Sequence, residues 1–191
     1  MTSIQFDGQQ SDERILYVIT PHQYATYIAI SKIVLLSILF FLILSFIAGV
    51  LPGAYSSAIR MSGFIFSLIL IISGVLWNQK VYHQSKTYIT DRRIIRFEIV
   101  SPFFQAKRML FWSEALKAKA FSPNLFYRML KIGTIQVEPH LSGGENVRVT
   151  DVYYFEDLAN YIDKILYVVK NSPQEITSLR PFVPKPKGER G

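Results

Sequence analysis

The sequence predicts a membrane protein in which a two-helix transmembrane hairpin precedes a small β-barrel or bent sheet of six or seven strands, capped by one C-terminal α-helix. Three observations indicate this fold class: two long apolar runs within the first 80 residues, a series of short strand-like segments after them, and one amphipathic helical pattern near the end. The 191 residues therefore divide into a membrane anchor and one small domain.

Residues 1–27 are mixed and polar. They lack the basic start followed by a short apolar stretch that is typical of a cleaved signal peptide. We therefore expect an N-terminal cytoplasmic segment and a first apolar run that is retained in the protein.

The two apolar runs comprise residues 28–51 and 57–77. The first contains only Lys32 as a charged residue and the second only Arg60, each near one end of its run. At about 1.5 Å per residue, each run is long enough for a helix that crosses a hydrocarbon core of roughly 30 Å. The Pro52-Gly53 pair suits a tight turn, so residues 28–79 should form a helical hairpin with a short external loop near residues 54–57.

The distribution of basic residues predicts the orientation of this hairpin. The outer end of the hairpin offers only Arg60, near the start of the second run, whereas five basic residues follow that run closely: Lys80, Lys86, Arg92, Arg93 and Arg96. Because basic residues are enriched on the cytoplasmic side, we expect a multi-pass protein of the cell (inner) membrane with both termini in the cytoplasm.

Composition excludes several classes of chemistry. With no cysteine, the chain has neither disulfides nor thiolate zinc sites. Its three histidines lack metal-ligand spacing, and no phosphate loop, dinucleotide fingerprint or serine elbow is present. We therefore expect no cofactor, no metal and no catalysis.

The formal charge of +7 arises wholly from residues 80–191, which hold 18 of the 21 basic and 11 of the 14 acidic residues. Charge alone allows nucleic-acid binding, but the basic residues are scattered through the strand-like segments. A neighbouring bilayer explains them more simply, so we expect membrane lipids as contacts and no nucleic acid.

The cytoplasmic domain, residues 80–171, reads as β-rich. Short segments with β-branched and aromatic residues predict strands over residues 86–90, 93–100, 106–112, 115–121, 132–138 and 146–152. From Phe155 to Lys170 apolar residues recur at helical spacing, and Asn171 followed by Pro173 ends this helix. Residues 172–191 have little apolar surface and should form a flexible basic tail.

One short motif and its setting resemble a known family. The motif is Tyr88-Ile-Thr-Asp-Arg-Arg-Ile-Ile95, preceded by two apolar runs and followed by Gly133-Thr-Ile135 and the closing helix. Together they resemble the bacterial membrane-flanked pleckstrin-homology-like family over roughly residues 28–170. The chain departs from that pattern in having Lys131 and Ile132 before Gly133, where a second glycine is often found. The resemblance implies a pleckstrin-homology-like (PH-like) barrel and no particular ligand.

The motif itself predicts a structural turn made by Tyr88, Thr90, Asp91, Arg92 and Arg93. Asp91 is placed to accept hydrogen bonds from backbone amides two residues on, with help from Thr90, and one arginine to pair with Asp91 or with a nearby carbonyl. A single acid beside two guanidinium groups, with no nucleophile, does not suit general acid catalysis.

Two functions fit this fold. In the first, the domain is a membrane-anchored, non-catalytic interaction module whose open sheet edge or barrel end captures a protein partner or a second copy of the chain. In the alternative, a basic hairpin face recognises anionic lipid headgroups through Arg92, Arg93, Lys107 and Arg108, while Phe104 dips into the interface. Phe103 and Phe104 should lie at a hairpin tip, and the simpler interpretation, which we favour, packs one of them into the core while the other shields a loop. We expect the interaction module.

Overall fold

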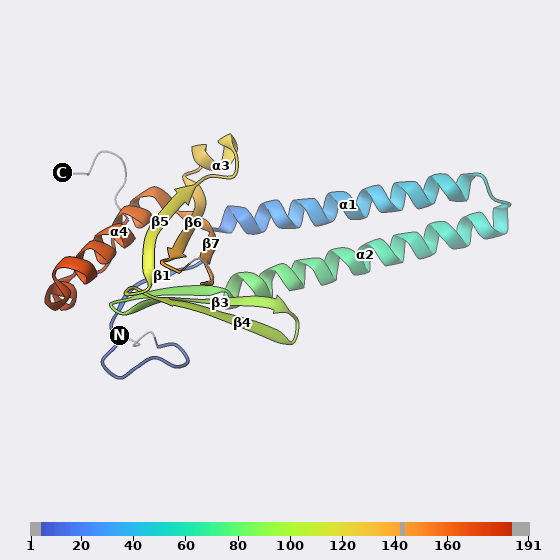
Figure 1. The fold of residues 1–191 in the computed structure, drawn as a ribbon. Coiled ribbons are helices and arrows are strands. Elements are labelled where there is room, and N and C mark those ends of the chain that lie inside the picture. Colours follow the sequence, from blue (N-terminus) through green and yellow to red (C-terminus); the bar gives the residue numbers. More distant parts are fainter. Residues whose placement is uncertain (1–4, 142–143, 185–191) are drawn as a thin grey trace. The chain divides into compact units, whose positions relative to one another are not determined.

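The structure is a computed structural model that describes residues 5–141 and 144–184. The chain forms two compact units (Figure 1). One comprises residues 23–83, and the other combines residues 1–22 with residues 84–191. The second unit is therefore assembled from two stretches of sequence that the first unit separates.

The first unit is a hairpin of two long helices, α1 (Gln23–Gly49) and α2 (Gly53–Gln84), which run side by side in Figure 1. The Ser67 hydroxyl donates a hydrogen bond of 3.2 Å to the Ser37 carbonyl, and the rings of Phe40 and Phe66 lie 5.5 Å apart. The predicted hairpin is confirmed. However, the residues expected as an external loop, 54–57, already belong to α2, because the helix begins directly after Pro52.

Both helices are long and apolar enough to cross a membrane. Their large apolar side chains mostly point outward, as for Phe46, which is 79% exposed, and Leu35 and Leu36. A core helix in a water-soluble protein buries such side chains, so this pattern is the one expected of a helix surrounded by lipid.

The second unit begins with a strand that the sequence analysis missed. Strand β1 (Ile15–Ile19) pairs antiparallel with β2 (Lys86–Thr90), so that Val18 lies opposite Tyr88. We expected residues 1–27 to form a separate N-terminal segment. This expectation is wrong for residues 15–19, which form a strand of the domain, and for residues 23–27, which belong to α1. The helical hairpin is an insertion, in sequence, between two neighbouring strands of one sheet.

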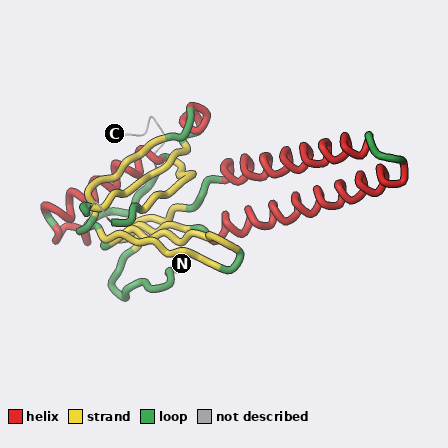
Figure 2. The backbone as a smooth tube through the Cα atoms, turned by 45° about the vertical axis from the view of Figure 1, so that its right-hand side comes forward, coloured by secondary structure: helices red, strands yellow, loops and turns green. Residues whose placement is uncertain are grey.

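Two antiparallel sheets form the body of this unit, as the tube in Figure 2 shows. The first has the order β1-β2-β3-β4, with β3 at Arg93–Ser101 and β4 at Phe104–Phe111. The second has the order β5-β6-β7, with strands at Ala115–Phe121, Ile132–Pro139 and Val147–Tyr153. All six predicted strands are present.

A short helix that was not predicted, α3 (Leu125–Met129), joins β5 to β6, and the Asn124 side chain caps it by accepting from the Tyr127 amide. Lys131, just after it, has φ of 56°. This left-handed conformation favours glycine, so Lys131 adopts a backbone that a glycine would adopt more easily.

The predicted closing helix is α4 (Phe155–Asn171). Its apolar face is buried, including Leu158, Ile162 and Ile165, while Asn160 is exposed. The helix packs on a core that both sheets supply. At Gly133 in β6, an added Cβ would lie 2.5 Å from the Phe155 ring, so a glycine is needed for the helix to approach this strand.

The segment after α4 is ordered further than expected. A 3-10 helix, η1 (Pro173–Ser178), follows directly, and Leu179 is buried in the core. The Phe182 amide donates to the Leu16 carbonyl at 3.2 Å, and its ring lies 4.9 Å from that of Tyr17. A flexible tail starting at residue 172 is therefore wrong, since residues 173–182 pack on the domain; residues 185–191 lie outside the described part.

Candidate functional site

The turn between β2 and β3 is held mainly by Thr90. Its hydroxyl accepts from the backbone amides of Arg92 and Arg93, at 3.2 and 3.0 Å, and lies 2.9 Å from a Glu13 carboxylate oxygen. Asp91 does not accept these amides. Its carboxylate accepts from the Arg14 amide at 3.2 Å, which fastens the start of β1 to the turn.

Arg93 makes a two-pronged ion pair with Glu13. The Nε and one terminal nitrogen of the guanidinium donate to the two carboxylate oxygens at 2.9 and 2.8 Å. The side chains are only 7% and 0% exposed. Burial by itself raises the pKa of Glu13, but the hydrogen bonds from Arg93, the Gln10 amide and Thr90 outweigh it and leave the pKa below its usual value.

The four basic residues proposed for lipid headgroups each have a partner within the domain. Arg92 pairs with Asp12 and Gln10, and Lys107 donates to the Asp7 carbonyl at 3.1 Å. Arg108 pairs with Glu145 in the loop before β7 at 3.2 Å. Together with the buried Arg93, each of these side chains already has an acidic or carbonyl partner within the domain.

Phe103 and Phe104 lie where the sequence placed them, at the tip of the β3–β4 hairpin. Neither packs into the core, since they are 90% and 73% exposed. Val100 on the facing strand is 63% exposed. The interpretation that one phenylalanine is a core residue is therefore wrong.

No group of three or more histidine, cysteine or acidic side chains is arranged for a metal ion among the described residues. His140 borders the pocket described below, and the His22 ring stacks near that of Tyr153 at 4.9 Å.

Strand β5 is one of the two edges of the second sheet, because it pairs with β6 and has no strand on its other side in the sheet order. The Ala118 amide points to that open side, where it donates to the Asp163 carboxylate of α4 at 3.1 Å. Since backbone groups alternate in direction along a strand, the Ala120 amide faces the same side. The strand thus presents backbone donors toward α4.

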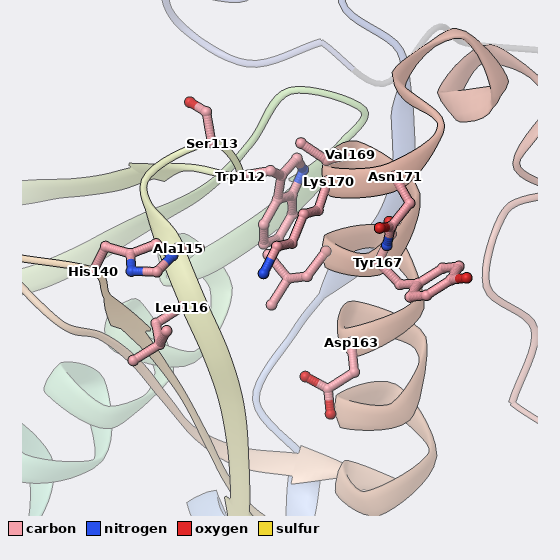
Figure 3. A pocket seen from close by; sticks show the side chains of 11 residues that line it. Trp112, Ser113, Ala115, Leu116, His140, Asp163, Tyr167, Val169, Lys170 and Asn171 are labelled. Carbon is pink, nitrogen blue, oxygen red and sulfur yellow. The ribbon is translucent and has the colours of Figure 1, made fainter.

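Two hollows lie between this edge and α4, one at each end of β5, and together with the edge they are called the groove. Toward the start of β5 it opens into a pocket of about 570 Å³, shown in Figure 3, where side chains from β5, from the residues just before it and from α4 meet. The lining residues include Trp112, Leu116, His140, Asp163, Tyr167 and Lys170. A second hollow, of about 420 Å³, lies at the other end of β5, beside Phe121 and Phe155.

Three of the seven residues of β5 are alanines, at positions 115, 118 and 120. Small side chains leave room beside the helix, whereas a larger apolar residue at these positions would fill it. The groove combines exposed apolar surface, from Leu116 and Tyr167, with a strand edge that has no neighbouring strand. It offers a surface of the kind that an extended polypeptide can occupy.

Comparison with protein-family models, with curated proteins and with solved structures found no match.

Sequence reasoning located the hairpin tip and the turn but not the groove or the Glu13 partner. The sequence features that could have indicated the groove are the alanine-rich strand 115–121 and the amphipathic helix. The sequence does not show which strand lies at the edge of the sheet, because that depends on the strand order. The signal for Glu13 was weaker still, because one of three acids in a polar segment of 27 residues predicts no particular partner.

Proposed function

We propose that this chain is a membrane-anchored, non-catalytic interaction module whose β5–α4 groove binds an extended segment of a protein partner. The helical hairpin crosses the membrane and holds the domain at its cytoplasmic face. The bound segment adds to β5 as a further strand, with its backbone paired to the outward-facing amides and carbonyls. Apolar side chains at alternate positions of the segment occupy the hollows on either side of the Ala118–Asp163 hydrogen bond.

The observation that carries the proposal is the open β5 edge beside a groove. Adding a strand to an exposed sheet edge is a general mode of peptide recognition, in which the main chain gives affinity and pockets give specificity. Natural proteins usually protect such edges with charge, proline or covering elements. Here the Asp163 carboxylate accepts a hydrogen bond from one amide of the edge, that of Ala118. A bound segment would displace this exposed side chain.

The PH-like family assignment is part of the same proposal. A four-stranded sheet followed by a three-stranded sheet and a closing helix supports it, as does the turn motif at Tyr88 to Ile95. The β1 strand ahead of the helical hairpin adds a feature to this plan, because it places the membrane anchor between the first two strands of the barrel.

Site-specific photocrosslinking in native membranes tests the function. A photoreactive phenylalanine analogue replaces Tyr167, which borders the groove, or Phe126 of α3 as the matched control, since both are exposed aromatic residues on helices. We expect a discrete crosslinked product from position 167 and none from position 126. A product of twice the chain mass indicates a second copy, and any other mass indicates a different partner.

A second variant tests whether the strand edge is used. Ala120→Pro removes the outward-facing amide and should abolish the crosslink from position 167, whereas Ala120→Ser keeps that amide and should preserve it. Thermal unfolding confirms that each variant remains folded. Should Ala120→Pro unfold the domain, Leu116→Glu provides the same test from an exposed side chain. Equal crosslinking from positions 167 and 126 would reject the groove as the binding site.

A further inference from the structure

The β3–β4 hairpin extends well beyond the rest of its sheet (Figure 1). The last residue of β3 paired with β2 is Phe97, which lies opposite Lys86, the first residue of β2. Four further residues of β3, from Glu98 to Ser101, pair with β4 alone or lead into the turn. At roughly 3.3 Å per residue, the tip projects about 13 Å past the start of β2.

The direction of this projection follows from the register. The chain arrives at Lys86 from α2, which ends at Gln84, so the start of β2 is the part of the domain tethered to that helix by a single intervening residue. Because β3 runs antiparallel to β2, the tip lies on the side of the domain where the chain enters.

The tip carries the side chains that an interfacial anchor needs. Val100, Phe103 and Phe104 are 63%, 90% and 73% exposed, and they stand together at one end of a two-stranded ribbon. Exposed large apolar residues grouped in this way mark a contact surface rather than an incidental feature. Aromatic side chains in particular favour the membrane–water interface.

From these observations we propose that the β3–β4 tip, residues 100–104, inserts its apolar side chains into the interface of the membrane that α1 and α2 cross. It rests on the proposal that these helices span a membrane and is independent of the groove. The contact is with the acyl-chain boundary of the lipid and does not require specific headgroups, because the basic residues nearby already have partners within the domain. Insertion would fix the orientation of the domain at the bilayer.

The absence of cysteine allows a clean test with the full chain. Single cysteines replace Phe103 at the tip, Phe126 on α3 and Leu42 within α1, and each is labelled with an environment-sensitive fluorophore after reconstitution into phosphatidylcholine–phosphatidylglycerol nanodiscs. Lipids spin-labelled on their acyl chains act as quenchers. We expect blue-shifted emission and quenching at positions 103 and 42, and water-like, unquenched emission at position 126.

Comparison of the labelled positions 42 and 103 distinguishes failure of the tip insertion from failure of the membrane span. Quenching at 42 without quenching at 103 would overturn the tip insertion and leave the membrane span intact, whereas absence of quenching at both would reject the span itself. Protection of position 103 from aqueous iodide without lipid quenching would show that protein covers the tip and would likewise overturn the inference. With the fluorophore moved to position 105, Phe103→Asp together with Phe104→Asp should abolish the lipid quenching.

Discussion

The guanidinium of Arg93 and the carboxylate of Glu13 form a buried, two-pronged ion pair between residues that the entire helical hairpin separates in sequence. The pair joins the turn after β2 to the segment that precedes β1. It is completed by the hydroxyl of Thr90 and the amide of Gln10. The pair thereby holds the polar N-terminal segment against the part of the domain that follows the helical hairpin in sequence.

Removing one member of this pair should destabilise the domain strongly. Glu13→Ala leaves the Arg93 charge buried without its partner, and we expect a loss of about 3 kcal/mol in the free energy of unfolding. Asp12→Ala, which breaks the exposed pair with Arg92, should cost at most about 1 kcal/mol. Denaturant unfolding in detergent, followed by Trp112 fluorescence in a Trp77→Phe background, measures both. Similar losses for the two variants would contradict the structural role of Glu13.

The same pair predicts a dependence on pH. Hydrogen bonding to Arg93 and its neighbours leaves the folded-state pKa of Glu13 below 4.5, its reference value in the unfolded chain. Its stabilising contribution is therefore fully present above pH 4.5 and disappears as the pH falls through the folded-state pKa. The stability difference between wild type and Glu13→Gln should be constant near neutral pH and shrink in acid, as thermal unfolding across a pH series will show. A difference that grows in acid would mean the shift has the opposite sign.

The closing helix provides a test of the core. Leu158 and Ile162 are fully buried beneath α4, so either residue changed to Ala should lower the free energy of unfolding by roughly 2–5 kcal/mol. Asn160 lies on the exposed face, and Asn160→Ala should have almost no effect. Chemical denaturation compares the three variants, and equal losses at positions 158 and 160 would mean that the helix presents a different face to the sheets.

Membrane topology is predicted by the distribution of basic residues and has its own test. A cysteine at Ser56, in the first turn of α2, should react with a membrane-impermeant thiol reagent in intact cells, because this end of the hairpin is expected outside. A cysteine at Ser122, between β5 and α3, should react only after the membrane is permeabilised. Labelling at position 122 in intact cells would reverse the proposed orientation.

Local patterns in the sequence were sufficient for much of the fold. The apolar runs, the strand segments and the helical stripe beginning at Phe155 each depend on neighbours within a few residues, so periodicity and turn residues predicted them. The tip at Phe103 and Phe104 was predicted for the same reason, since Pro102 separates two strand-like segments.

Tertiary structure decided the features that depend on distant partners. Strand β1 is only five residues long and lies in a polar segment, and it becomes a strand because β2, beyond the hairpin, offers it an edge. The residues after α4 likewise fold because the core accepts Leu179. The sequence by itself determined most of the helices and strands, through local spacing and side-chain type, but not β1, α3 or η1. Only the tertiary structure decided three further features: the pairing of Arg93 with Glu13, the open edge at β5 and the exposure of the β3–β4 tip. Each depends on the order of the strands in the sheets, and therefore on residues far apart in the chain.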